Sequence, residues 1–331
     1  MYRHRSPPAP IMPRPLLMLL CLVLLPLAAG AEVTVQEYPL PRGHRVHDVW
    51  ADPAPDGPVW FSAQGSGHLG ILDPKSGKVE LVPLGAGSSP HGVIAGADGA
   101  PWLTDGGQNA IVRVDPQTRA VKAWKLPADA GYANLNTAIF DAKGIHWFTG
   151  QSGVYGRLDP RTGEMRVYKA PKGRGPYGIH VTPQGDVYYA SLAGSHIARI
   201  DGASGEARVI EPPTERQGAR RVWSDSKGDI WVAEWNSGNL SRYEPRTGKW
   251  SAWKAPGQGP QVYAVYVDEA DKVWISEWAS QSMMRFDPAT EKFEAFKSSS
   301  PHANVRQIHG RKGEVWTPES AADKIVVYRY N

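Results

Sequence analysis

Residues Gln261–Pro288 carry the sequence QVYAVYVDEADKVWISEWASQSMMRFDP, in which short runs of strand-forming residues alternate with polar turns. The next run, KFEAFK, alternates apolar and polar residues, as a strand does when one face of its sheet is buried and the other is wet. The expected strands are Val262–Val267, Lys272–Glu277, Met283–Phe286 and Lys292–Lys297. Four short strands joined by turns form one blade of a β-propeller, so this stretch predicts a blade.

The same unit recurs along the chain at intervals of 41 to 45 residues, counted between the aromatic residues at the centre of each second strand. These aromatic residues are Trp60, Trp102, Trp147, Tyr188, Trp231, Trp274 and Trp316. A period of this length indicates blades arranged in a ring, because one coil of a β-solenoid needs far fewer residues. The sequence therefore predicts an all-β fold, a seven-bladed β-propeller.

The two ends of the repeat region complement each other. Seven central strands are followed by only six fourth strands, because the chain stops after Lys324–Tyr330. The stretch Thr34–Pro41 (TVQEYPLP) has the pattern of the missing strand and precedes the first complete unit. We expect this N-terminal strand to pair into the last blade and close the ring, which removes the exposed edges of an open sheet. Residues 32–331 are predicted to form this single domain.

The N-terminal residues have the features of a secretory signal peptide. Three arginines precede the apolar run Leu16–Leu27, and the small residues Ala29–Ala31 follow it. Removal of residues 1–31 would take away Cys21, the one cysteine, and would leave 34 basic against 33 acidic side chains. We therefore expect a secreted or periplasmic protein without disulfides and without a membrane span after cleavage of the signal.

The composition also limits the classes of partner that we expect. A nucleic-acid partner is not expected, because the mature chain is nearly neutral and shows no basic stripe. A propeller of this size is self-contained, so we expect a monomer. Its ligand is expected to be a small molecule at the mouth of the central channel.

Two rings of side chains are expected at one mouth, because the innermost strand of each blade starts where the antiparallel second strand ends. The first ring comprises His47, His91, Asn136, Tyr177, Arg220, Tyr263 and Arg306. The second comprises Ala63, Asp105, Gly150, Ser191, Glu234, Glu277 and Glu319, with Trp235 and Trp278 next to two of the glutamates. Candidate substrate-binding residues among and beside them are Tyr177, Arg220, Glu234, Asp105 and Trp278.

The carboxylates of the second ring allow two interpretations. They suit a hard cation such as Mg²⁺ or Ca²⁺, which prefers oxygen ligands, and His47 or His91 beside such a cation could act as a general base. In the alternative, the glutamates accept hydrogen bonds from the backbone, or form salt bridges between blades with Arg220, Arg221 and Arg306.

Several motifs of the chain resemble the virginiamycin B lyase (streptogramin lyase) family. They are Pro90–Val93 (PHGV), Pro176–Ile179 (PYGI), the repeated Trp-x-x-Glu at Trp231–Glu234 and Trp274–Glu277, and the Asn-x-Ile/Leu-x-Arg pattern at Asn109–Arg113, which Asn239–Arg242 repeats one residue shorter. The resemblance extends over the whole mature chain. It implies a seven-bladed propeller and a Mg²⁺-assisted elimination that opens an ester bond of a cyclic depsipeptide antibiotic.

The resemblance also implies site residues, and this chain departs from the family at several of them. Glu319 is similar to one metal ligand, whereas Asn304 falls at the place of a second ligand that is a glutamate in the family. Arg306 falls at the place of the catalytic histidine, and Tyr263 at the place of another histidine. Arginine is protonated at any working pH and cannot abstract a proton. His302, in Pro301-His302-Ala303, is the alternative base if the preceding loop is rearranged.

Three functions follow from these observations. The first is a secreted lyase that uses a cation at the propeller mouth. The second is a propeller that binds a small ligand or a protein and has lost the catalytic base. The third is a metal-dependent hydrolase similar to gluconolactonase-type propellers, in which water bound to the cation attacks an ester. The enzyme functions need a cation held by Glu277 and Glu319 beside a free base, whereas the binding function tolerates Arg306 paired with Glu319.

Overall fold

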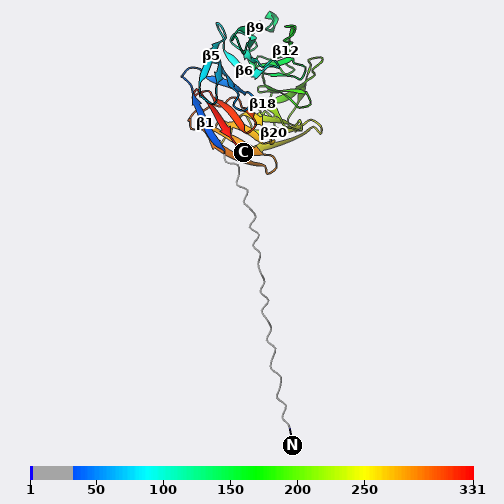
Figure 1. Cartoon of the computed structure of the whole chain (residues 1–331). Helices are drawn as coiled ribbons and strands as arrows, with labels where there is room; N and C mark the ends of the chain where they lie inside the picture. The colour runs from blue at the N-terminus through cyan, green and yellow to red at the C-terminus, as the bar shows by residue number, and fades with distance from the viewer. Residues whose placement is uncertain (3–32) are drawn as a thin grey trace. The chain divides into compact units, whose positions relative to one another are not determined.

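Seven antiparallel four-stranded sheets contain all of the strands among residues 33–331 of the computed structural model (Figure 1). The structure describes Met1, Tyr2 and residues 33–331. The predicted signal peptide, residues 1–31, therefore lies outside the described residues except for its first two. Residues 33–331 form one unit, and the prediction of a seven-bladed propeller is confirmed.

The blades are numbered here in chain order. Blade 1 is β2 (Val46–Ala51), β3 (Val59–Ala63), β4 (His68–Leu72) and β5 (Val79–Pro83); blade 2 is β6 (Pro90–Ala95), β7 (Pro101–Asp105), β8 (Ala110–Val114) and β9 (Val121–Lys125). Blade 3 is β10 (Leu135–Phe140), β11 (His146–Gly150), β12 (Val154–Leu158) and β13 (Met165–Lys169); blade 4 is β14 (Pro176–Val181), β15 (Val187–Ser191), β16 (His196–Ile200) and β17 (Ala207–Ile210). Blade 5 is β18 (Ala219–Ser224), β19 (Ile230–Glu234), β20 (Asn239–Glu244) and β21 (Lys249–Lys254); blade 6 is β22 (Val262–Val267), β23 (Val273–Glu277), β24 (Ser282–Asp287) and β25 (Lys292–Lys297). Blade 7 is β26 (His309–Arg311), β27 (Glu314–Glu319), β28 (Lys324–Arg329) and β1 (Thr34–Pro39).

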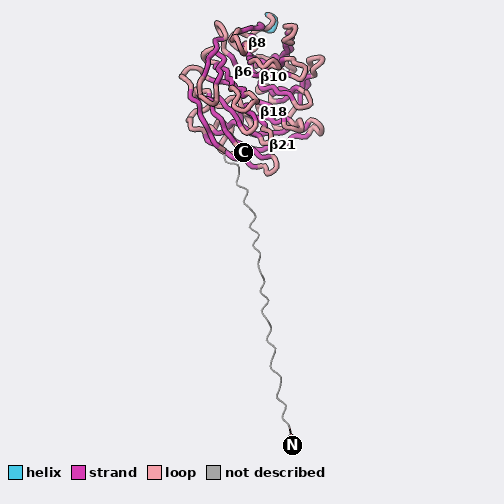
Figure 2. The backbone as a smooth tube through the Cα atoms, viewed as in Figure 1, coloured by secondary structure: helices cyan, strands magenta, loops and turns pink. Residues whose placement is uncertain are grey.

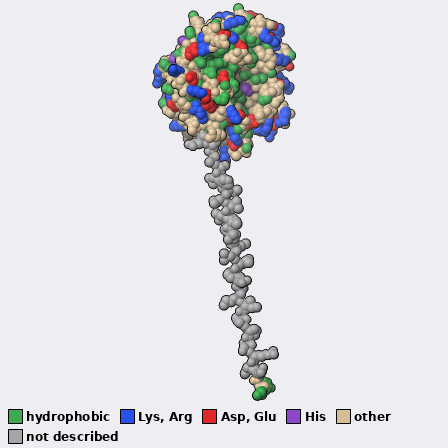
Figure 3. Space-filling view, in the orientation of Figure 1, with side chains coloured by type: hydrophobic (Ala, Val, Ile, Leu, Met, Phe, Trp, Pro, Cys, Tyr) green, Lys and Arg blue, Asp and Glu red, His purple; other side chains and the backbone are tan. Residues whose placement is uncertain are grey.

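Helical structure is nearly absent from the described part of the chain. The 3₁₀ segment η1 (Ala128–Ala130) is its one helical element, and it is cyan in Figure 2. Among these residues no helix has the length and apolar character needed to cross a lipid bilayer. The face seen in Figure 3 mixes positive and negative side chains, and hydrophobic side chains gather near its middle.

The N-terminal strand closes the ring, as the strand count predicts. β1 pairs antiparallel with β28 along its whole length, from Thr34 opposite Arg329 to Pro39 opposite Lys324. In Figure 1 the blue β1 lies beside the red C-terminal strands. Tyr38 anchors this strand, because its ring stacks on Trp316 at 5.7 Å between centroids and its hydroxyl donates to the carbonyl of Pro74 at 2.9 Å.

The central aromatic residues pack in the interior, as expected for residues that fill the space between blades. Trp147, Trp231, Trp274 and Trp316 are almost completely buried. In three of these blades the indole N–H donates to an aspartate of the preceding turn, as Trp274 does to Asp268 at 2.8 Å. A buried indole therefore keeps its polar atom satisfied.

A β-bulge near the start of the innermost strand is the feature that positions the site. In blade 2, Pro90 pairs with Asp105 and the next pair is Val93 with Leu103, so the innermost strand carries one extra residue. The same shift occurs in all of the first six blades. A bulge leaves a residue unpaired and re-aims its side chain, here at the axis of the ring.

Because β1 closes the ring, we expect Tyr38→Ala to lower the stability of the protein strongly. Removal of this buried ring and its hydrogen bond should lower the free energy of unfolding by about 3–5 kcal/mol, measured by urea denaturation. Val35→Ala on the same strand is the control, because Val35 is 51% exposed and should change the stability little. Equal effects of the two substitutions would show that β1 does not lock the ring.

Candidate functional site

The first ring of predicted residues lies at one end of the channel. Each member directly follows the innermost-strand residue that pairs with the last residue of the second strand, as Pro90 pairs with Asp105 before His91 and Val305 with Glu319 before Arg306. The bulges therefore bring His47, His91, Asn136, Tyr177, Arg220, Tyr263 and Arg306 to one level of the ring. Contacts between non-neighbouring blades join several of them.

Two histidines form one side of this ring. The His47 and His91 rings lie 3.7 Å apart between centroids, and the Asn136 amide nitrogen lies 3.1 Å from Nε2 of His91. Burial lowers the pKa of His47 well below its usual value, and the positive charges of Arg306, Arg221 and Arg220 lower it further. Burial also lowers the pKa of His91, helped by His47. Both imidazoles are therefore neutral at pH 7.

Two tyrosines and two arginines form the other side. The hydroxyls of Tyr177 and Tyr263 are 2.6 Å apart; Arg220 Nη2 donates to Tyr177 at 3.2 Å and Arg306 Nη1 to Tyr263 at 3.4 Å. The Arg220 guanidinium lies 3.5 Å from the centroid of the Tyr263 ring. Trp278 stacks on Tyr263 at 4.8 Å and lies under Arg306.

The electrostatic effects on the two tyrosines are opposite. Burial alone would raise the pKa of Tyr177, but the charges of Arg220 and Arg221 outweigh burial and lower this pKa. Burial raises the pKa of Tyr263, which also faces Tyr177. If one of the two hydroxyls ionises, it is therefore that of Tyr177.

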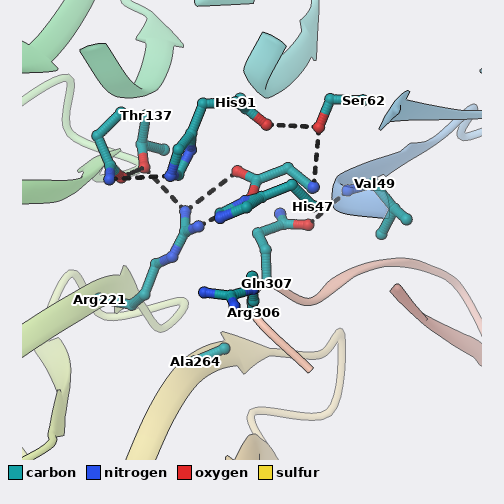
Figure 4. A network of polar contacts seen from close by, with 12 residues as sticks. His47, Val49, Ser62, His91, Thr137, Arg221, Ala264, Arg306 and Gln307 are labelled. Carbon is teal, nitrogen blue, oxygen red and sulfur yellow. Dashed lines mark hydrogen bonds and ion pairs between the residues drawn. The ribbon is translucent and has the colours of Figure 1, made fainter. Parts of the chain in front are cut away.

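A buried ion pair crosses the channel below the first ring. Arg221 of blade 5 donates to both carboxylate oxygens of Asp48 in blade 1, at 2.8 and 3.2 Å, and to the hydroxyl of Thr137 in blade 3 at 2.8 Å (Figure 4). Asp48 also accepts from Nδ1 of His47 at 2.8 Å. The side chains of Asp48 and Arg221 are 2% and 5% exposed. This pair, together with Thr137, links blades 1, 3 and 5 across the channel.

The carboxylates of the second ring accept hydrogen bonds from adjoining turns and from the segments that connect neighbouring blades. Glu277 accepts from the backbone N–H groups of Gln261, Ala279 and Ser280 at 2.7 to 2.8 Å. Glu319 accepts from the hydroxyls of Ser298 and Ser300. These glutamates therefore accept hydrogen bonds, as the alternative to a cation site predicts.

Asp105 and Glu234 are used in the same way. Asp105 accepts from the hydroxyl of Ser88 and from the backbone N–H of Ser89 and of Gln108, and Glu234 accepts from Ser237 and Asn239. Neither is more than 1% exposed. Both were predicted to bind substrate, and the structure places them under the turns that border the mouth.

The donor set at the mouth does not fit a Mg²⁺ or Ca²⁺ ion. Within residues 33–331, the ligand atoms of three histidines or carboxylates come within 4.8 Å of one another only for His47, Asp48 and His91. The charge of Asp48 is already matched by Arg221. The predicted ligands do not converge, because Glu277 and Glu319 cap separate turns and the side-chain oxygen of Asn304 faces Gln281 at 3.4 Å. Three arginine charges nearby also oppose a cation.

Arg306 contacts residues other than the glutamate considered as its salt-bridge partner. It does not pair with Glu319; its Nε donates to the hydroxyl of Ser320 at 2.9 Å and its guanidinium lies 5.1 Å from the Trp278 ring centroid. His302, the alternative base, lies in an exposed turn. A rearranged loop that inserts His302 is therefore not seen.

Arginines surround the mouth without acidic partners. Arg42, Arg45 and Arg306 line a pocket of about 550 Å³ together with Asn304, Ser320 and Asp323. The carboxylate of Asp323 accepts hydrogen bonds from the backbone N–H groups of Gly43 and Arg45, at N···O distances of 2.8 and 2.5 Å. In the described part of the chain, no carboxylate oxygen lies within 4.0 Å of a side-chain nitrogen of Arg42, Arg45, Arg220 or Arg306, whereas Arg221 has such a partner.

Sequence reasoning named Arg221 but missed its partner, Asp48. The position after the first ring holds Asp48, Gly92, Thr137, Gly178, Arg221, Ala264 and Gln307 in the seven blades. Small or neutral residues fill it everywhere except in blades 1 and 5. Opposite charges at one repeat position were the signal that could have revealed the pair.

Comparisons with known proteins agree with this architecture. The model of the virginiamycin B lyase family matches residues 28–249. Selenomethionine-substituted virginiamycin B lyase from Staphylococcus aureus is 19% identical, with a TM-score of 0.82 over 90% of this chain and 99% of that one. A streptogramin B lyase is 20% identical, with a TM-score of 0.82 over 90% and 98% of the two chains.

A third solved structure carries a ligand. It is a catalytically inactive His-to-Ala variant of the Staphylococcus aureus virginiamycin B lyase with quinupristin, 20% identical, with a TM-score of 0.81 over 90% of this chain and 99% of that one. At these identities the likeness shows the fold alone. No curated protein matches the chain.

The ion pair across the channel predicts strong coupling between Asp48 and Arg221. Asp48→Asn should lower the free energy of unfolding by about 3–5 kcal/mol, because it leaves a buried guanidinium without its counter-charge. Arg221→Met should be similarly harmful, and the double variant should lose less than the sum, with a coupling of about 0.5–3 kcal/mol. Urea denaturation of the four proteins measures this cycle.

The exposed pair of Asp186 and Arg199 in blade 4 provides the control cycle. Asp186→Asn and Arg199→Met should each change the stability by less than about 1 kcal/mol, because solvent screens this pair. Additive losses in the Asp48–Arg221 cycle would contradict the assignment of a channel-spanning ion pair.

Proposed function

The chain belongs to the virginiamycin B lyase family, and from that premise we propose that it binds a small anionic molecule at the mouth of its propeller channel. The observation that carries this proposal is the set of arginines there without acidic partners: Arg42, Arg45, Arg220 and Arg306. Two carboxylates of this region have other partners, since Asp323 accepts from backbone N–H groups and Asp48 pairs with Arg221. The mouth therefore presents an excess of fixed positive charge.

The arginines closest to the axis are held in place before any ligand arrives. Ser320 and Tyr263 orient Arg306, and Tyr177 together with the Tyr263 ring orients Arg220. Arg220 and Arg306 are both partly exposed residues, whereas Nε of Arg220 is buried. A guanidinium binds a carboxylate or phosphate through two parallel hydrogen bonds, and a fixed one loses little side-chain entropy in doing so. A carboxylate-bearing small molecule fits this arrangement.

The same side chains argue against the cation-assisted functions. A metal-assisted lyase and a gluconolactonase-like hydrolase both need a cation beside a base, and the carboxylates expected to hold it are hydrogen-bonded elsewhere. Arg306 stands where the resemblance implies the catalytic histidine, and an arginine cannot take a proton at working pH. The binding function requires neither group.

A second candidate function is a carbon–oxygen lyase that works without a metal, and one observation favours it. The pKa of Tyr177 is lowered by Arg220 and Arg221, and its hydroxyl lies 2.6 Å from that of Tyr263. A tyrosinate at this place could abstract a proton next to a carbonyl group, while Arg220 and Arg306 bind the negative charge that forms. Tyr177 is only 3% exposed, which makes binding the better supported function.

Export is part of the proposal. The arginines and the apolar run before residue 31 support a periplasmic or secreted location, where small anions from the surroundings would reach the mouth.

Citrate binding tests the proposed site. Isothermal titration calorimetry at low ionic strength should detect binding that weakens as salt is added, because exposed charges are screened. Arg306→Gln and Arg220→Gln should each lower the affinity by about tenfold, which corresponds to about 1.4 kcal/mol. Arg246→Gln, in an exposed turn of blade 5, removes the same charge far from the mouth and should have no effect. Equal losses in all three variants would refute a specific site.

Ring opening of quinupristin separates the candidate reactions. The binding function predicts no opening with Mg²⁺ or with EDTA, followed by mass spectrometry. Opening in EDTA that disappears in Tyr177→Phe would favour the metal-free lyase. Opening that requires Mg²⁺ and disappears in Glu319→Gln would contradict both candidates and restore the metal-assisted reaction.

A further inference from the structure

The innermost strands enclose a cavity on the side of the ion pair away from the first ring. Its lining comes from the middle and later residues of these strands, about three residues beyond the first-ring positions, or roughly 10 Å along an extended strand. The cavity volume is about 190 Å³. An engineered apolar cavity of about 150 Å³ in another protein binds benzene, so this volume suits a molecule with one ring.

Aromatic and aliphatic side chains form the walls. His180 stacks on Trp223 with ring centroids 4.1 Å apart and planes 25° from parallel, and Trp223 packs edge-on against Tyr266 at 4.9 Å. Ile94 and Ile139 lie on the lining contributed by blades 2 and 3. Flat rings prefer stacked or edge-on contacts of this kind, so the walls favour a planar ligand.

The lining carries no net charge at neutral pH. The two charged residues that contribute to it, Asp48 and Arg221, neutralise each other. Burial lowers the pKa of His180 to about 3 and that of His309 to about 4, so both rings are neutral at pH 7. A charged ligand would lose its hydration here and find no free counter-charge.

Two buried polar atoms of the lining residues lack a partner within residues 33–331. They are Nδ1 of His180 and Nε of Arg221. Arg221 is 4% exposed, and a buried donor without an acceptor is unfavourable. A ligand hydroxyl in the cavity offers a donor and an acceptor to the side chains that carry these atoms.

We propose that this cavity is a second ligand site, which takes a neutral aromatic molecule of one ring that carries a hydroxyl group. The site is independent of the proposed anion site, because the Asp48–Arg221 pair and Thr137 lie between them. The two sites also differ in chemistry, since one is cationic and open whereas the other is neutral and mainly apolar.

The test uses 4-methylphenol as the probe, in a ligand-observed NMR titration of the full folded protein. We expect one binding site with a Kd on the order of 1 mM or below. Toluene should bind more weakly because it lacks the hydroxyl, and 4-methylbenzoate should not compete for the site because it is charged. Citrate at saturation should leave the affinity for 4-methylphenol unchanged.

Two variants of blade 2 give a matched comparison. Ile94→Trp fills the cavity and should lower the affinity for 4-methylphenol at least tenfold. Val121→Trp adds the same ring on the outermost strand β9, where Val121 is 38% exposed, and should leave the affinity unchanged. If Ile94→Trp does not fold, Ile139→Phe takes its place. His180→Leu should abolish the preference for 4-methylphenol over toluene.

The outcomes distinguish this site from the mouth. Absence of 4-methylphenol binding at millimolar concentration, or binding that survives the cavity-filling variants, would overturn the second site whatever citrate does. Loss of 4-methylphenol binding in Arg306→Gln would likewise overturn it, because that would place the probe at the mouth.

Discussion

The ion pair between Asp48 and Arg221 joins residues that are 173 positions apart and lie on opposite sides of the channel. Each is buried, so either charge alone would be strongly destabilising, and the pair is acceptable only because both are present with further hydrogen bonds from His47 and to Thr137. The contact links blades 1, 3 and 5 at the axis of the ring. Contacts between neighbouring blades alone would leave the channel open there. The ion pair also divides the channel into two ends of different chemistry.

At the mouth, the propeller scaffold carries arginines without acidic partners. The bulge in the innermost strand of each of the first six blades directs one residue at the axis, and the identity of these residues decides what the mouth can hold. Here Arg220 and Arg306 supply permanent positive charge, and Tyr263 supports both of them. A site with fixed guanidinium groups has no need of a cation to attract an anion. The arginine charges would repel such a cation. Few carboxylates also remain free to bind it.

The sequence was sufficient for the architecture and for the first ring. The repeat period predicts seven blades and a closing N-terminal strand, because each blade is built from local pairs of strands with short turns. Strand ends in the opening stretch differ by at most one residue, as for Ser282–Asp287 against the expected Met283–Phe286. The offset from each central aromatic residue also locates His91 and Tyr263, because the bulge recurs at one place in each of the first six blades.

What the sequence could not give is the direction of side chains and the contacts across the ring. Glu277 and Glu319 stand at the expected level, but their carboxylates turn back into the adjoining loops, where backbone and hydroxyl donors are nearer than the axis. Asp48 and Arg221 meet only because the ring closes, so no local pattern connects them. Anomalous diffraction from crystals soaked with bromide and Mn²⁺ tests the central claim most directly. We expect bromide between Arg220 and Arg306 and no Mn²⁺ at the mouth; Mn²⁺ bound by Glu277 or Glu319 would contradict it.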